Sequence, residues 1–179
     1  MKVARIGILG SGAVGTAVGT GFMKLGNQVM FYDLDEERVH EVHDLGLNAT
    51  TDLARVIHQS DISFLCVPTP TKNRKIDLAP IESATKDLAH YLKDKSDYHV
   101  VVVKSTVTPT TTEKIIIPLL EKSSGKRVGP SIGVCVNPEF LTEGHRSWTE
   151  DSSYARDFFT EERIVIGQLD KRSGDAVQV

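Results

Sequence analysis

The sequence contains little cysteine and no long apolar run. Cys66 and Cys135 are the only 2 cysteines among 179 residues, and both are flanked by apolar residues (FLCVP and GVCVN). This pattern predicts two small residues inside buried strands and argues against a disulfide framework. No apolar stretch approaches the ~20 residues that span a bilayer, and glycine interrupts the apolar start MKVARIGILGSG too early for a secretory signal. We therefore expect a soluble, cytoplasmic protein without a membrane partner.

Charge of one sign is not in large excess either. The 21 Lys and Arg residues and 24 Asp and Glu residues leave a formal net charge of -3, which gives no reason to expect nucleic acid as a partner. The 6 histidines lack metal-ligand spacing, so we expect no metal site. The length allows one domain, residues 1–179, and is too short for two large ones.

Short β-branched runs alternate with helical patterns along the chain. The predicted strands are Val3–Leu9, Gln28–Tyr32, Ile62–Val67, His99–Lys104, Ile132–Val136 and Arg163–Ile166. The predicted helices are Ala13–Leu25, Glu36–Leu45, Leu78–Leu92 and Thr111–Leu120. This alternation predicts an α/β fold of Rossmann type, doubly wound, with a mainly parallel sheet and helices on both faces.

The C-terminal part of the chain is less regular. We expect Gly144–Thr160 to form a long loop, because this stretch is polar and poorly periodic. The tail QLDKRSGDAVQV resembles the start of a further helix that is cut off before it can pack. These features predict a domain that is truncated at its C-terminus.

A glycine-rich run follows the first predicted strand. Gly10, Gly12 and Gly15 form G-x-G-x-x-G between a strand and a helix, which is the context of the dinucleotide-binding fingerprint. Gly10 would permit a tight turn, Gly12 would let the backbone approach a pyrophosphate, and Gly15 would bring helix and sheet close together. The helix N-terminus would add free N–H groups and a partial positive charge. The plainer alternative is a tight turn without a ligand.

The second predicted strand ends in an acidic residue. Asp33 lies about 20 residues beyond the glycine run, where a carboxylate can accept hydrogen bonds from both hydroxyls of an adenosine ribose. The same carboxylate would repel the 2′-phosphate of NADP. Arg38 alone would hint at NADP, but Asp33 favours NAD. The alternative for Asp33 is a solvated residue at a strand end.

Polar loops follow the third and fourth predicted strands. The segment VPTPTK, Val67–Lys72, is stiffened by two prolines and presents Thr69, Thr71 and Lys72, although it could be a plain rigid turn. In KSTVTP, the hydroxyls of Ser105 and Thr106 could bind a nicotinamide ribose, a substrate or a water, or could cap the next helix. Ligands of open parallel sheets lie at these carboxyl ends.

Two glutamates follow the fifth predicted strand in NPEFLTEG. Glu139 and Glu143 are four residues apart, so both carboxylates share one face of a helical turn. Two nearby acids favour a raised pKa on one of them, which suits a general base. Spacing alone leaves open the alternative of two exposed glutamates at a helix start.

These segments together resemble a known family. GSGAVG, an Asp that ends the second strand, VPTPT, KSTV, NPEFLTEG and RIVIG occur in this order in the UDP-glucose/GDP-mannose dehydrogenase family. The resemblance covers nearly the whole chain. It implies two successive oxidations of the C6 alcohol of a nucleotide sugar, with NAD as cofactor, in a parent enzyme that is a homodimer or larger. The sequence most resembles the members that act on UDP-glucose.

The resemblance also implies roles for individual residues. The NAD-binding residues would be Gly10, Ser11, Gly12, Ala13, Val14, Gly15, Asp33, Arg38, Val67, Pro68, Thr69, Pro70, Thr71, Ser105, Thr106, Val107 and Glu143. Thr106 and Glu139 would be catalytic, Thr106 near the reacting carbon and Glu139 in hydrolysis of a covalent thioester. The substrate would contact Glu139, Phe140, Leu141, Thr142 and Glu143.

The sequence departs from the family pattern in three places. The family's STV is commonly followed by proline and glycine, but here Pro109 is followed by Thr110. The stretch after Gly144 is longer than the usual connection to RIVIG. The nucleophilic cysteine motif G-x-G-F-G-G-x-C and its lysine and asparagine partners do not occur, and neither Cys66 nor Cys135 matches that motif. We therefore expect NAD binding without complete oxidation.

Two alternatives stay open at this point. A free NAD-binding regulatory module would explain the missing nucleophile but not the presence of NPEFLTEG. Another NAD-dependent dehydrogenase, such as a β-hydroxyacid type, would explain the glycines and Asp33 but not VPTPT or the paired glutamates.

Overall fold

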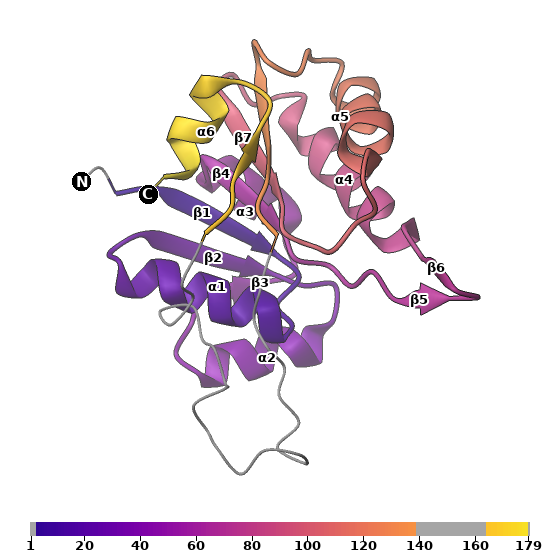
Figure 1. Cartoon of the computed structure of the whole chain (residues 1–179). Coiled ribbons are helices and arrows are strands. Elements are labelled where there is room, and N and C mark those ends of the chain that lie inside the picture. The colour runs from indigo at the N-terminus through magenta and orange to yellow at the C-terminus, as the bar shows by residue number, and fades with distance from the viewer. Residues whose placement is uncertain (1–2, 139–163, 179) are drawn as a thin grey trace.

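The structure, a computed structural model, describes residues 3–138 and 164–178 (Figure 1). Seven strands form one sheet in the order β3-β2-β1-β4-β7-β8-β9. The pairs from β3 to β8 are parallel and β9 is antiparallel to β8. These strands are β1 (Arg5–Leu9), β2 (Gln28–Tyr32), β3 (Ala49–Thr50), β4 (Ile62–Leu65), β7 (His99–Val103), β8 (Ile132–Val136) and β9 (Gly167–Gln168).

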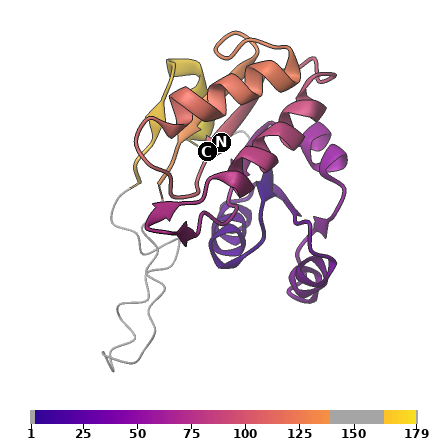
Figure 2. The same cartoon turned by 90° about the vertical axis from the view of Figure 1, so that its right-hand side faces the viewer.

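Helices cover both faces of this sheet (Figure 2). The helices are α1 (Ala13–Lys24), α2 (Glu36–Asp44), α3 (Leu53–Gln59), α4 (Ala79–Leu92), a π-helical turn η1 (Thr112–Ile116), α5 (Ile117–Ser124) and α6 (Lys171–Val177). α1, α2 and α6 pack on one face, and α3, α4, η1 and α5 pack on the other. Every residue of β7 is buried, as expected for a strand covered on both faces. The predicted fold class is confirmed.

A small hairpin stands apart from the main sheet. β5 (Thr71–Lys72) and β6 (Lys75–Ile76) pair in antiparallel fashion and project from the side where β1 and β2 end (Figure 1). The two turn residues, Asn73 and Arg74, both have positive φ, at 51° and 62°, which is the geometry of a two-residue hairpin turn. The segment predicted as a stiff loop therefore continues into a hairpin.

The C-terminal elements differ from the sequence prediction. Residues 164–166 form no strand, and the edge strand lies instead at Gly167–Gln168, where it pairs with the end of β8. α6 packs against β8, with Ser173, Gly174 and Val177 buried. The expectation of a helix cut off before packing was therefore wrong. Asp170 caps α6 through a hydrogen bond from the Ser173 amide, at 2.9 Å.

Both cysteines are free thiols. Cys135 is buried in β8, whereas Cys66 lies just beyond the end of β4 and is half-buried. The expectation that both lie inside strands was therefore correct only for Cys135. In the described part of the chain, no helix has the length and apolar character needed to cross a membrane.

Thr110 occupies a strained backbone position before η1. Its φ is +71°, a left-handed conformation that is costly for a β-branched residue and free of cost for glycine. The family that the sequence resembles commonly has glycine after the proline, at the position that Thr110 occupies here. We expect Thr110→Gly to raise the free energy of unfolding by about 1 kcal/mol, measured by urea denaturation. Thr110→Ala keeps a Cβ and should recover less of this energy; an equal gain in both variants would contradict the role of backbone strain.

Candidate functional site

A cleft opens where β1, β2, β4 and β7 end. Its volume is about 450 Å³, and β1 lies at its centre, between β2 and β4, so the chain winds in opposite directions on its two sides. Ligands of doubly wound folds bind at this kind of switch point. The cleft is lined by Gly10, Gly12, Ala13, Val14, Asp33, Arg38, Cys66, Val67, Pro68, Thr69, Lys104, Ser105 and Thr106. Most of the predicted cofactor-binding residues are therefore brought together.

The three glycines of the loop have different surroundings. Gly10 has φ +97°, and a Cβ there would lie 2.7 Å from the Cys66 carbonyl oxygen. A Cβ on Gly15 would lie 1.9 Å from the Gly10 carbonyl oxygen, so α1 can approach the loop only because this residue is glycine. A Cβ on Gly12 would meet nothing within 4 Å. Gly10 and Gly15 thus serve the fold, while Gly12 leaves open space at the N-terminus of α1.

Asp33 is tied to the glycine-rich loop. Its Oδ2 accepts hydrogen bonds from the Ser11 amide at 2.8 Å and from the Ser11 hydroxyl at 3.0 Å. Its Oδ1 accepts from the Asp35 amide at 3.2 Å. Ser11 is 1% exposed, so it supports the loop from beneath instead of lining the cleft. Asp33 is therefore an organised part of the site and not a freely solvated residue at a strand end.

Arg38 reaches the cleft from α2. Its guanidinium forms an exposed ion pair with Glu41, one turn along the same helix. Arg38 also borders a groove between α1 and α2 that Ser11, Gly12 and Thr16 line. A cation therefore lies close to the free N-terminus of α1.

The loops after β4 and β7 are hydrogen-bonded to each other. The Ser105 hydroxyl donates to the carbonyl oxygens of Leu65 and Val67, at 3.1 and 2.6 Å, and does not cap a helix. The Thr69 hydroxyl donates to the Thr106 carbonyl oxygen at 2.7 Å. Ser105 and Thr69 thus brace the cleft wall, and Thr106 is exposed in it.

Some predicted residues lie away from the cleft. Pro70 and Thr71 belong to the base of the hairpin, and Val107 lines a separate hollow beside β8 and β9. The predicted residues Glu139, Phe140, Leu141, Thr142 and Glu143 lie outside the described residues. Their proposed contacts remain predictions.

Sequence reasoning missed Lys104 and Cys66 as lining residues. Lys104 is 6% exposed and follows β7 directly. The available signal was a lysine at the end of the otherwise apolar run VVVVK. Cys66 gave no comparable signal, because its position just past the strand depends on where β4 ends.

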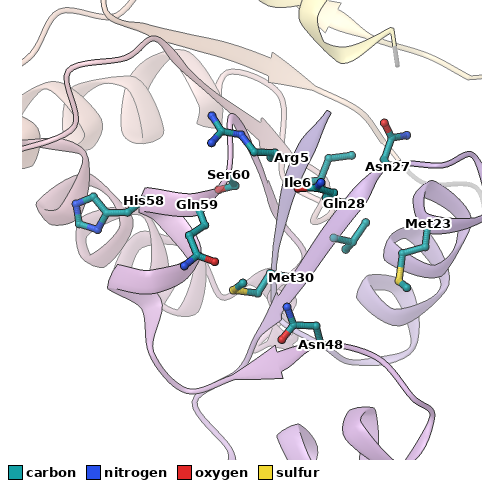
Figure 3. A pocket seen from close by; sticks show the side chains of 11 residues that line it. Arg5, Ile6, Met23, Asn27, Gln28, Met30, Asn48, His58, Gln59 and Ser60 are labelled. Atoms are coloured by element: carbon teal, nitrogen blue, oxygen red, sulfur yellow. The ribbon is translucent and has the colours of Figure 1, made fainter. Parts of the chain in front are cut away.

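A second hollow lies at the opposite ends of the strands from the cleft (Figure 3). Its volume is about 600 Å³, and Arg5, Gln28, Met30, Asn48 and Gln59 are among its lining residues. It adjoins the amino ends of β1 and β2, and none of the predicted site residues lies there. Arg5 is already paired with Asp61, whose pKa is lowered by this hydrogen-bonded ion pair. The size of a hollow therefore does not identify the site in this fold.

Comparison with known proteins identifies relatives of this chain by sequence. Residues 40–179 match the NAD binding domain of the UDP-glucose/GDP-mannose dehydrogenase family. A GDP-mannose 6-dehydrogenase of Pseudomonas syringae pv. syringae is 35% identical over 195 aligned residues, which cover 97% of this chain and 43% of the relative. The UDP-glucose 6-dehydrogenase AglM of Haloferax volcanii is 37% identical over 189 residues, covering 94% and 42%.

Solved structures agree with these sequence matches. A crystal structure of a ternary complex of GDP-mannose dehydrogenase from Pseudomonas aeruginosa matches with a TM-score of 0.85 and 34% identity, covering 97% of this chain and 43% of that chain. A UDP-glucose dehydrogenase from Pyrobaculum islandicum matches with a TM-score of 0.84 and 29% identity, covering 98% and 43%. The chain thus spans less than half the length of these relatives.

Proposed function

Because the chain belongs to the UDP-glucose/GDP-mannose dehydrogenase family, as its NAD-binding domain, we propose that it is the cofactor-binding part of a nucleotide-sugar 6-dehydrogenase of the UDP-glucose type. The observation that carries this proposal is the cleft at the switch point, with Gly12 open to a ligand and Asp33 fixed beside it. The matching family domain is an NAD binding domain. The assignment of individual residues to NAD is our proposal.

The residues of the cleft fit a dinucleotide. The space at Gly12 and the N-terminus of α1 suit a pyrophosphate, because the N-cap residue Gly12 has no side chain to cap the N–H groups there. The Asp33 carboxylate suits the adenosine ribose and opposes a 2′-phosphate. Val67, Ser105 and Thr106 lie on the other side of β1, where the nicotinamide half would lie.

The chain's own contribution to the reaction is binding and orientation. NAD held by these residues would supply a hydride acceptor for oxidation of the alcohol carbon of the substrate. Asp33 and the glycine-rich loop hold one end of the dinucleotide, and the Ser105 and Thr69 hydrogen bonds keep the opposite wall in place. The exposed Thr106 would place its hydroxyl near the reacting carbon. Glu139 would promote thioester hydrolysis, as the family resemblance implies.

Neither cysteine of the chain is suited to be the nucleophile of this oxidation. Cys135 is 1% exposed, and burial raises the pKa of its thiol, which disfavours the reactive thiolate. Cys66 lines the cleft beside Gly10, without the glycine-rich motif of the family nucleophile. We therefore propose that this chain alone binds NAD and does not produce NADH from UDP-glucose.

GDP-mannose is the second candidate substrate of the whole enzyme. Identity to a GDP-mannose 6-dehydrogenase of Pseudomonas savastanoi pv. phaseolicola is 43% over 133 residues, compared with 37% over 189 residues for the UDP-glucose 6-dehydrogenase AglM. Incubating the chain and NAD with each sugar nucleotide and following absorbance of NADH tests both candidates. Turnover with either one would overturn the proposal that the chain is inactive alone.

Calorimetric titration with NADH and NADPH tests the cofactor proposal. We expect NADH to bind in the micromolar range and NADPH at least about tenfold more weakly, because Asp33 opposes the extra phosphate. Asp33→Ala should weaken NADH binding and reduce the preference. Asp35→Asn, a neighbouring carboxylate change outside the cleft, is the matched control and should leave both affinities unchanged. Equal binding of the two cofactors by the unaltered chain would overturn the role of Asp33.

A further inference from the structure

A buried lysine lies in the wall of the cleft and has no role in the function proposed above. Lys104 is 6% exposed, follows β7 directly and lines the cleft with Ser105 and Thr106. Its Nζ donates a hydrogen bond to Asn137 Oδ1 at 3.1 Å. The backbone amide of Lys104 donates to the Leu65 carbonyl oxygen at 3.0 Å, which fixes the residue relative to β4.

Asn137 extends this contact to a third segment. It is 8% exposed and follows β8, and its backbone amide donates to the Val103 carbonyl oxygen at 3.0 Å. Its Nδ2 donates to the Val165 carbonyl oxygen at 2.8 Å. Because an ammonium group can only donate, Lys104 holds the Asn137 amide with its oxygen toward Nζ and its nitrogen toward Val165. Lys104, Asn137 and Val165 thus form one chain of hydrogen bonds.

The buried ammonium group of Lys104 is energetically unfavourable if its only role is to fill space. Burying a charged group is unfavourable unless hydrogen bonds compensate for the lost water, and methionine would fill a similar volume without that penalty. Lys95 provides the contrast. It is also 6% exposed, but its Nζ donates to backbone carbonyls of Ile57 and Ser60, away from the cleft. Lys95 has a purely structural position, whereas Lys104 lines the cleft.

We propose that Lys104 is a positioning residue for the nicotinamide half of the cleft. Its hydrogen bond to Asn137, which in turn bonds Val165, fixes the ends of β7 and β8 relative to each other. Ser105 and Thr106 follow Lys104 in the cleft, on the side of β1 away from Asp33. This inference rests on the proposed function, because it assumes that a dinucleotide lies across β1. In this arrangement the glycine-rich loop and Asp33 bind the adenosine half, and that binding does not depend on Lys104.

Comparison of NADH with ADP-ribose tests the proposal. ADP-ribose has the adenosine, the pyrophosphate and the second ribose but no nicotinamide. We expect Lys104→Met to weaken NADH binding by about tenfold or more while ADP-ribose binding changes little. Asn137→Leu should have a similar effect, and the double variant should lose no more than either single variant, because the two residues act as one unit.

Two further variants separate positioning from folding. Lys104→Gln keeps an N–H donor toward Asn137 and should retain part of the NADH affinity even if Lys104→Met folds poorly. Lys95→Met is the matched control: it should lower the unfolding midpoint without changing the ratio of NADH to ADP-ribose affinity. Failure of the unaltered chain to bind ADP-ribose would count against the proposed function itself. Binding of ADP-ribose with an unchanged ratio in Lys104→Met and Lys104→Gln would overturn the role of Lys104 alone.

Discussion

Replacing Gly12 with aspartate should abolish measurable NADH binding and leave the fold intact. A Cβ at this position meets no protein atom within 4 Å, so the side chain would extend into the space assigned to the pyrophosphate. Its carboxylate would add like-charge repulsion and occupy the amides of the α1 N-terminus. We expect a loss of at least about 100-fold in affinity, or roughly 3 kcal/mol, measured by calorimetry.

The expected stability of this variant follows from the position of Gly12 in the helix. Gly12 is the N-cap residue of α1, with extended backbone angles and no side-chain hydrogen bond. Aspartate is one of the preferred N-cap residues, so the free energy of unfolding should be unchanged or slightly higher. Binding and stability therefore change independently in this variant.

Gly15→Ala is the contrasting variant of the same loop. Its added Cβ would lie 1.9 Å from the Gly10 carbonyl oxygen and 3.1 Å from Ile8, so α1 would have to move away from β1. We expect a loss of several kcal/mol in unfolding free energy, visible in urea denaturation. If Gly12→Asp proved as destabilising as Gly15→Ala, the open space at Gly12 would not be a ligand site.

The glycine-rich loop shows how much of the site could be predicted from local sequence. The turn at Gly10 and the close packing at Gly15 were predicted from one strand–turn–helix unit, and the geometry agrees with both, although Gly10 is also close to Cys66, beyond the end of β4. The hydrogen bonds between Asp33 and Ser11 could not be predicted in the same way. They join two positions that come together only once β1 and β2 pair in their observed register.

Short elements escaped sequence reasoning for a similar reason. β3 has two residues and α3 has seven, and neither length provides enough repeats for a periodic pattern to emerge. α3 nevertheless has a local start signal in Asp52, whose carboxylate accepts a hydrogen bond from the Arg55 amide at 3.0 Å. The position of β9 is set by pairing with β8 across the intervening chain, so the apolar run before it was mistaken for the strand.

The wall of the cleft depends on contacts that are distant in sequence. Ser105 was predicted to contact a ligand or cap a helix, but its hydroxyl donates to carbonyls 38 and 40 residues away. Lys104 was overlooked because a lysine at a strand end is normally solvated. Its burial results from the neighbouring strand ends, where Asn137 supplies a hydrogen-bond acceptor for its ammonium group.

Acid should destabilise the protein through His99, a buried residue far from the cofactor cleft. The ring is fully buried; its Nδ1 lies 3.1 Å from Lys95 Nζ and its Nε2 lies 2.8 Å from the Ser63 hydroxyl. Since an ammonium can only donate, Nδ1 must be the acceptor and Nε2 carries the proton. A second proton on Nδ1 would face the Lys95 charge in a dry environment. Burial, followed by the Lys95 charge, therefore lowers the pKa of His99 from 6.5 to about 3.

The sign of the pH dependence follows from this lowered pKa. Above about pH 6.5 the imidazole is neutral in both folded and unfolded chains, and the stability is complete; below it the unfolded chain takes up a proton that the folded chain refuses. Stability should fall by up to about 1.4 kcal/mol per pH unit, or roughly 2 to 3 kcal/mol between about pH 7.5 and about pH 4.5. Urea denaturation across this range measures the loss.

His99→Gln is the control for this pH dependence. Glutamine offers an acceptor to Lys95 and a donor to Ser63 but does not titrate, so the variant should be less stable at neutral pH and nearly independent of pH over the same range. The hydrogen bond with Arg5 is the main cause that lowers the pKa of the Asp61 carboxyl. This carboxyl also contributes to the free energy of unfolding, but that contribution is lost only as the pH falls below the ordinary carboxyl pKa of 3.8. The interval above about pH 4.5 therefore isolates the histidine. An equally steep fall in His99→Gln would show that another group takes up the proton.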